Sequence, residues 1–166
     1  MRLWQQFQDG RAGEAFPRLT DETSVERFPL RRGAMKILLI KLGALGDVLR
    51  TTPILEGLKK KYPECHVTWL VDPKNRPALE NNARIDRLES LEEGGQGWRK
   101  ARYDVVINLD KEPEALEALE GTKAALKMGF GGVGGKVCPV NDLSEYAYRL
   151  GVDDEGATVG VEESTQ

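Results

Sequence analysis

Histidine and cysteine are scarce in this chain of 166 residues, which has one histidine and two cysteines. The lone His66 excludes a histidine triad and a histidine-rich metal site. Cys65 and Cys138 lie far apart and form no C-x-x-C pair. This spacing argues against a disulfide framework or a zinc site and predicts neutral thiols in a reducing compartment.

Long apolar runs and an excess of basic charge are also missing. No apolar run approaches the roughly 18 residues that span a bilayer, and roughly the first 30 residues lack the apolar core of a secretory signal. We therefore expect a cytoplasmic protein. The net charge of −3 argues against a nucleic-acid partner. With 40% apolar and 31% charged residues, the composition is that of one globular domain.

The chain divides into three parts by composition. Residues 1–34 hold six arginines and five acidic residues with few periodic apolar positions, which predicts a poorly ordered polar leader. Met35 stands directly before the first apolar run and is a second candidate start. Residues 35–156 alternate between strand and helix patterns and form the predicted domain. Residues 157–166 lack an apolar period, and we expect a frayed tail.

Strand and helix patterns alternate along the predicted domain. This alternation predicts an α/β fold, a Rossmann-like parallel sheet with helices on both faces. Thr52 is expected to cap the main part of the first helix, with Pro53 as its first residue. The predicted strands are 37–40, 66–71, 85–91, 105–109 and 128–130, and the predicted helices are 48–62, 77–82, 98–102, 112–126 and 141–150.

Polar or glycine-rich segments follow four of the predicted strands. Ligands of open parallel sheets bind beyond the carboxyl ends of the strands, so these segments mark the candidate site. They are Lys41 with the turn Gly43–Asp47, then Asp72, then Asp110 with Lys111, and finally the loop Gly129–Lys136.

The turn Gly43–Asp47 admits two interpretations. Asp47 could only cap the following helix, with the glycines serving the turn. Alternatively, a carboxylate at the mouth of a cleft could accept a proton from an attacking hydroxyl. The start of a helix favours the ionised carboxylate, which makes Asp47 a weak base unless the bound substrate excludes water.

The run from Lys36 to Pro53, KILLIKLGALGDVLRTTP, resembles the N-terminal signature of glycosyltransferase family 9, the ADP-heptose:lipopolysaccharide heptosyltransferases and their relatives. The similarity continues through LKKKYP ending at Pro63, VTWLV ending at Val71, IDRL from Ile85, and YDVVINL ending at Leu109. It covers roughly residues 36–151. Members of that family have two Rossmann-like domains in the GT-B arrangement, with the active site between them.

The resemblance implies a role for Asp47 as the general base that deprotonates an acceptor hydroxyl. Attack on the anomeric carbon of a nucleotide-activated heptose then inverts that carbon without a metal. No cofactor is implied, because the nucleotide sugar is a substrate. The glycine loop and the two threonines after it would line the acceptor side, and the strand ends add a lysine and an aspartate. The predicted substrate-binding residues are thus Lys41, Gly43, Ala44, Leu45, Gly46, Thr51, Thr52 and Asp110.

The resemblance also implies partners. They are a glycan or glycolipid acceptor, a nucleotide-sugar donor and, transiently, the inner face of the inner membrane. In the family the C-terminal domain holds most of the donor, and we expect that domain to be absent from this chain. A separate chain would then supply it, and the isolated chain should not turn over donor.

Two other functions stay open from the sequence. One is a non-catalytic Rossmann-like domain with a nucleotide or regulatory ligand at the same rim, and the other is a fragment without activity. Asp72 follows the second strand as a ribose-binding acid would, yet a plain strand-ending turn fits equally well. Gly129–Gly134 matches G-x-G-x-x-G, but no helix pattern follows it, so we expect a rim loop there.

Overall fold

The computed structural model describes residues 34–91, 97–133, 136–141 and 144–145. The predicted leader up to residue 33, the tail 157–166 and most of the last predicted helix lie outside these residues. Within them, no helix is long and apolar enough to cross a membrane. Both cysteines are free thiols.

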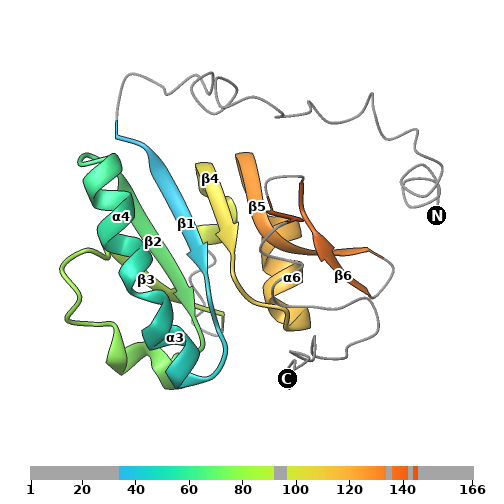
Figure 1. Ribbon diagram of the computed structural model, residues 1–166, viewed down its shortest axis with the longest axis horizontal. Helices are drawn as coiled ribbons and strands as arrows, with labels where there is room; N and C mark the ends of the chain where they lie inside the picture. Colours follow the sequence, from blue (N-terminus) through green and yellow to red (C-terminus); the bar gives the residue numbers. More distant parts are fainter. Residues whose placement is uncertain (1–33, 92–96, 134–135, 142–143, 146–166) are drawn as a thin grey trace, which may run out of the picture.

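Six strands form a sheet in the order β3-β2-β1-β4-β5-β6. The first five strands of the sheet pair in parallel, and β6 runs antiparallel to β5. The carboxyl ends of the central strands therefore meet at one edge, which is the lower edge in Figure 1. The strands are β1 Lys36–Ile40, β2 His66–Val71, β3 Arg87–Ser90, β4 Arg102–Asn108, β5 Lys123–Val133 and β6 Lys136–Pro139.

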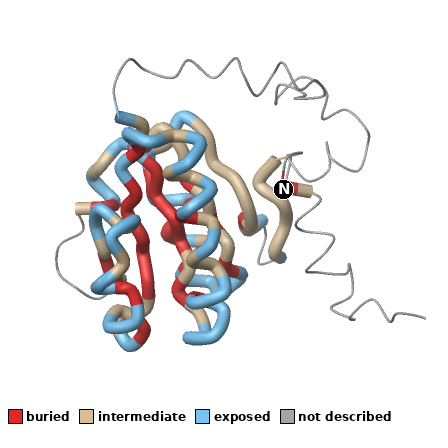
Figure 2. The backbone as a smooth tube through the Cα atoms, turned by 60° about the vertical axis from the view of Figure 1, so that its left-hand side comes forward, coloured by how far each residue is buried: buried red, intermediate tan, exposed pale blue. Residues whose placement is uncertain are grey.

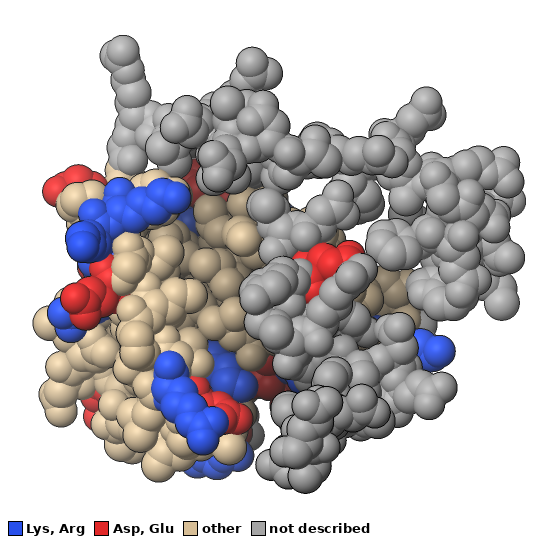
Figure 3. Space-filling model, viewed as in Figure 1, with Lys and Arg blue, Asp and Glu red and all other residues tan. Residues whose placement is uncertain are grey.

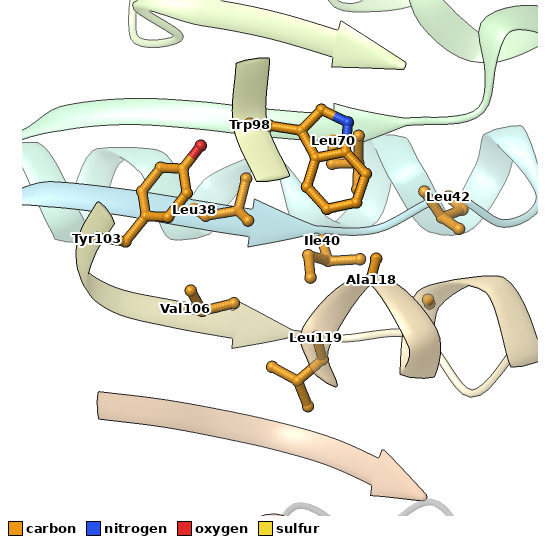
Figure 4. Packing of buried hydrophobic residues seen from close by; sticks show 10 residues of the cluster. Leu38, Ile40, Leu42, Leu70, Trp98, Tyr103, Val106, Ala118 and Leu119 are labelled. Carbon is orange, nitrogen blue, oxygen red and sulfur yellow. The ribbon is translucent and has the colours of Figure 1, made fainter. Parts of the chain in front are cut away.

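Helices cover both faces of the sheet, as predicted. Two apolar clusters, one on each face, hold them in place. The first face carries α3 (Leu45–Thr51), α4 (Pro53–Lys61) and the 3₁₀ helix η2 (Pro73–Ala78). The second face carries α5 (Gly97–Lys100) and α6 (Pro113–Gly121), and its packing around Trp98 is shown in Figure 4.

The central strands are buried on both sides. From Ile37 to Ile40, each side chain of β1 is at most 1% exposed, and Figure 2 shows the buried residues concentrated in the middle of the sheet. Leu38 and Ile40 pack on the α6 face, whereas Ile37 and Leu39 pack on the α4 face. Burial on both faces explains the continuous apolar run of a parallel strand, and the predictions for β1 and β2 are confirmed.

The first predicted helix is two helices, which meet at Thr52. Thr52 occupies the position before α4 and Pro53 is the first residue of that helix, as predicted. The prediction that the side chain of Thr52 caps α4 is wrong. Its hydroxyl makes no hydrogen bond to the first turn of α4 and instead donates to the carbonyl oxygen of Leu49 at 2.8 Å. The physical reason is that Thr52 keeps helical backbone angles, φ −56° and ψ −31°, so α3 runs into α4 without an extended cap residue.

The short helix predicted over 77–82 is wrong in its position. The structure has the 3₁₀ helix η2 at Pro73–Ala78, directly after β2. Asp72 caps it, because its side chain accepts a hydrogen bond from the backbone N–H of Lys74 at 3.0 Å. Asp72 is therefore part of a strand-ending turn, which was one of its two predicted roles.

The helix predicted to run from residue 112 to 126 is wrong at its end. α6 stops at Gly121, and Thr122 takes extended angles, φ −91° and ψ 148°, that lead directly into β5. β5 contains the predicted strand 128–130 and continues to Val133. The loop expected over Gly129–Lys136 is accordingly wrong, since β5 and β6 form an antiparallel pair there. The residues Gly129–Val133 of the G-x-G-x-x-G match lie in a strand and not before a helix.

Gly129 is the described residue at which glycine is required by backbone geometry. Its φ is +94°, and a Cβ atom there would lie 1.8 Å from the carbonyl oxygen of Asn108. We expect Gly129→Ala to lower the free energy of unfolding by about 2 kcal/mol or more. Urea unfolding measures this change.

Gly57→Ala is the matched control. Gly57 lies inside α4 with no atom within 4 Å of the added methyl group, so we expect a gain of up to about 1 kcal/mol. Equal effects of the two substitutions would contradict a special role for Gly129.

Candidate functional site

The chain turns sharply after β1, and one buried carboxylate binds the amides of that turn. The Oδ2 atom of Asp110 accepts hydrogen bonds from the backbone N–H of Leu42 at 2.9 Å and of Gly43 at 2.7 Å. The Nζ atom of Lys41 lies 3.3 Å from the same oxygen. Oδ1 accepts from the backbone N–H of Lys111 at 2.9 Å. Asp110 thus joins the ends of β4 and β1.

The carbonyl groups of the same turn are held by two other side chains. The indole Nε1 of Trp69 donates to the carbonyl oxygen of Lys41 at 3.2 Å. The side-chain amide of Asn75 donates to the carbonyl oxygens of Leu42, at 2.9 Å, and of Gly43. Because the N–H of Lys41 also donates to β2, all six backbone groups of residues 41–43 have a partner. We call these three residues the clamped turn.

Apolar packing and a second polar residue reinforce the clamped turn. The side chain of Leu42 is 5% exposed and joins the cluster under α6, beyond the end of β1 in Figure 4. Asn108 accepts the backbone N–H of Asp110 through its Oδ1 at 3.0 Å, and its side-chain amide donates to the carbonyl oxygen of Phe130. Asn108 therefore fixes Asp110 and ties β4 to β5.

Asp110 is an ionised carboxylate in a buried position. Burial by itself would raise the pKa of Asp110. The hydrogen bond from Gly43, the ammonium of Lys41 and the bonds from Leu42 and Lys111 together outweigh that effect, so the pKa lies below its ordinary value of 3.8. The side chains of Lys41 and Asp110 are 12% and 6% exposed, so this charge is largely shielded from solvent.

Asp47 is exposed, in contrast to Asp110. It lies in the first turn of α3, whose N-cap residue is Ala44, and no side chain caps that helix. The interpretation of Asp47 as a helix cap is therefore wrong. Its side chain is 54% exposed and lies 3.5 Å from the guanidinium of Arg50, which is 85% exposed. Figure 3 shows such acidic and basic side chains side by side at the lower edge of the molecule.

The remaining predicted site residues lie around Asp47 on α3 and at its end. Leu45 is 47% exposed, and Ala44 and Gly46 are exposed as well. The hydroxyl of Thr51 donates to the carbonyl oxygen of Asp47 at 2.8 Å. A hydroxyl that donates keeps its lone pairs as acceptors. The structure thus brings all of the predicted site residues to one edge of the sheet, and their binding roles stay predictions.

The two glycines of the motif differ in their surroundings. A Cβ atom on Gly43 would lie 3.0 Å from Oδ2 of Asp110, so this glycine allows the close approach of the carboxylate. A Cβ atom on Gly46 would have no neighbour within 4 Å. The fold of the described residues does not require glycine at position 46, and a ligand that approaches the backbone there is a separate reason for it.

Sequence reasoning missed Trp69, Asn75 and Asn108 as parts of the site. Asn75 is 4% exposed and Asn108 is fully buried, and a buried amide requires hydrogen-bond partners. Asn75 lies in η2 just beyond β2, and Asn108 is the last residue of β4. The position of these two asparagines at or just beyond strand ends was the one feature of the sequence that could have pointed to them. Within the described part of the chain, no three His, Cys, Asp or Glu side chains gather in a way that could hold a metal ion.

No family model matches the chain. It is 39% identical over 57 residues to lipopolysaccharide heptosyltransferase 1 of Campylobacter coli, a match that covers 34% of this chain and 17% of that protein. It is 27% identical over 112 residues to the lipopolysaccharide core heptosyltransferase OpsX of Haemophilus influenzae, covering 62% and 32%. The match to lipopolysaccharide heptosyltransferase 3 of Escherichia coli has 32% identity over 78 residues and covers 39% and 23%.

A solved structure agrees with these relatives. The glycosyl transferase family 9 protein from Veillonella parvula superposes with a TM-score of 0.52 at 27% identity, over 61% of this chain and 33% of that one. The chain is thus similar to the heptosyltransferases of glycosyltransferase family 9 in sequence and in fold. The family resemblance and the Rossmann-like fold expected from the sequence are thus confirmed. The chain spans a third or less of the length of the relatives described here.

The lowered pKa of Asp110 predicts how stability depends on pH. A carboxylate whose pKa is lower in the folded state contributes stability above its ordinary pKa of 3.8, and this contribution is lost as the pH falls through the folded-state value. We expect the difference in free energy of unfolding between the wild type and Asp110→Asn to be constant near pH 7 and to shrink below pH 3.8. Urea unfolding at a series of pH values measures it, and a difference that grows on acidification would contradict the assignment.

Proposed function

We propose that this chain forms the acceptor side of a glycosyltransferase. The enzyme transfers a sugar such as heptose from a nucleotide-sugar donor to a lipopolysaccharide-core or related glycan acceptor. The similarity to lipopolysaccharide heptosyltransferases supports this class of reaction. The observation that carries the proposal is the exposed carboxylate of Asp47, four residues after a turn whose backbone is fully hydrogen-bonded.

In the proposed reaction, Asp47 accepts the proton of an acceptor hydroxyl. The oxygen attacks the anomeric carbon from the side opposite the nucleotide, the bond to the diphosphate breaks, and the configuration inverts. This scheme uses no metal. The departing diphosphate needs positive charge or N–H donors, and we assign these groups to the part of the relatives that this chain does not cover. Donor binding then falls mainly on that part.

The pair between Asp47 and Arg50 is compatible with this role. Both side chains are mostly exposed and their closest charged atoms are 3.5 Å apart. An exposed ion pair of this kind is worth little, on the order of 0–1 kcal/mol. An acceptor hydroxyl can therefore replace the guanidinium next to the carboxylate at small cost.

Asp47→Asn tests the base. We expect kcat to fall by about 100-fold or more, because an amide cannot accept the proton, with the acceptor KM nearly unchanged. Heptose transfer from ADP-heptose is measured with the chain alone and with the chain fused to the part of the Veillonella parvula protein that it does not cover. Arg50→Gln, which removes the neighbouring charge, is the control and should keep most of the activity. Normal turnover of Asp47→Asn would exclude Asp47 as the base.

Gly46→Ala tests the approach of the acceptor. The added methyl group meets no atom within 4 Å, so we expect folding stability to be maintained. Binding of a lipopolysaccharide-core oligosaccharide, measured by calorimetry, should weaken by about tenfold because the methyl group occupies the space of the ligand. Gly57→Ala in α4 should leave binding unchanged.

The same calorimetry separates the acceptor domain from a nucleotide-binding domain. An acceptor domain binds the oligosaccharide and binds NAD or ADP weakly. Tight NAD binding that persists in Asp47→Ala would overturn the proposed function in favour of the non-catalytic domain.

A further inference from the structure

We propose that Asp110 is a positioning residue: its carboxylate holds the clamped turn and thereby sets the place of Asp47, without itself contacting the acceptor. This inference rests on the proposed function. Asp110 would then act on the reaction through the position of Asp47 and not by binding the substrate. Its substitution should therefore lower turnover.

The hydrogen-bonding capacity of Asp110 is largely used inside the fold. One oxygen accepts two backbone N–H groups and lies next to the ammonium of Lys41, and the other oxygen accepts the N–H of Lys111. A carboxylate oxygen has about two acceptor positions, so the three groups at Oδ2 fully occupy that oxygen, and Oδ1 is engaged by the N–H of Lys111. With its side chain 6% exposed, Asp110 offers an acceptor sugar almost no surface.

A short, hydrogen-bonded segment connects the clamped turn to Asp47 and fixes the position of that residue. Three residues separate Gly43 from Asp47. The first of them, Ala44, accepts the backbone N–H of Asp47 at 2.9 Å and of Val48 at 3.1 Å through its carbonyl oxygen. Val48 is fully buried and anchors α3 on the sheet. The start of the helix therefore follows the clamped turn, and Asp47 follows the start of the helix.

Gly43 and Asp110 act as one unit. Oδ2 of Asp110 would lie 3.0 Å from a Cβ atom at position 43, closer than side chains normally tolerate. The glycine thus lets the carboxylate reach two successive amides of the turn. An asparagine at position 110 cannot reproduce this arrangement: it lacks the charge that faces Lys41, and if its oxygen accepts the two amides of the turn, its NH₂ group faces the N–H of Lys111.

The same pair of strands supplies a matched control. Asp104, within β4, accepts the backbone N–H of Lys36 at the start of β1 at 2.8 Å. Asp110 accepts the N–H of Leu42 just after the end of β1 at 2.9 Å. Both bonds join an aspartate to an amide 68 residues away. Only Asp110 lies at the edge that carries Asp47.

The experiment compares Asp110→Asn, Asp104→Asn and Lys41→Met in the full chain. Amide hydrogen exchange is read at each residue, and kcat and acceptor KM are measured in the transfer assay described for Asp47. For Asp110→Asn we expect exchange at residues 42, 43, 47 and 48 to speed up by about tenfold or more while the strands stay protected. We expect kcat to fall by about tenfold to 100-fold, because a displacement of about 1 Å is enough for that, and KM to change by less than about threefold.

The two controls should behave differently. Asp104→Asn should speed exchange at Lys36 and leave kcat unchanged. Lys41→Met should leave amide exchange in the clamped turn nearly unchanged, because the amides of Leu42 and Gly43 keep Asp110 as their acceptor. Equal losses of kcat in Asp104→Asn and Asp110→Asn would overturn the proposal, since both would then act through general stability.

A direct contact with the acceptor would give another pattern. Loss of acceptor binding in Asp110→Asn with unchanged exchange in the turn would make Asp110 a ligand of the sugar and overturn the positioning role. If the wild type binds no acceptor, the proposed function fails, whereas the exchange data still decide whether Asp110 orders the turn.

Discussion

The buried carboxylate of Asp110 is the contact on which the arrangement of this site depends. Backbone groups that leave a strand and enter a buried turn need new hydrogen-bond partners. Here three side chains from different parts of the chain, Trp69, Asn75 and Asp110, supply them for the clamped turn. The turn is as completely bonded as the strand before it. The clamped turn, which lies between β1 and Asp47, is thus held as firmly by hydrogen bonds as the strand itself.

Two aspartates at the same edge have opposite environments. Asp110 has a side chain that is 6% exposed, and internal hydrogen bonds occupy its oxygens. Asp47 has a side chain that is 54% exposed and lies 3.5 Å from the guanidinium of Arg50, which is exposed as well. The internal bonds of Asp110 stabilise the turn, whereas Asp47 keeps an oxygen accessible to a ligand. This division matches an enzyme site in which one group does the chemistry and a rigid support holds it in place.

The sequence predicted the parts of the fold that local pattern determines. The apolar run before Lys41 and the strand starting at His66 were clear, because strands buried on both faces leave that signature. The segment after Gly121 was not, since its alanines and leucine favour a helix and only pairing with β4 makes it a strand. Asp47 and Asp110 were found from their place at strand ends. Asn75 was not, because its contacts depend on a chain approach that spacing does not encode. The functional class came from family resemblance, which periodicity could not provide.

The bonds of the clamped turn also constrain the order in which this domain can fold. The bond from Leu42 to Asp110 spans 68 residues and that from Asn75 to Leu42 spans 33. Contacts so distant along the chain form only after the intervening segment has closed, which is slow compared with forming a helix. During synthesis, β1 and α3 leave the ribosome well before β4. The turn that presents Asp47 can therefore acquire its shape only when the end of β4 docks beside β1.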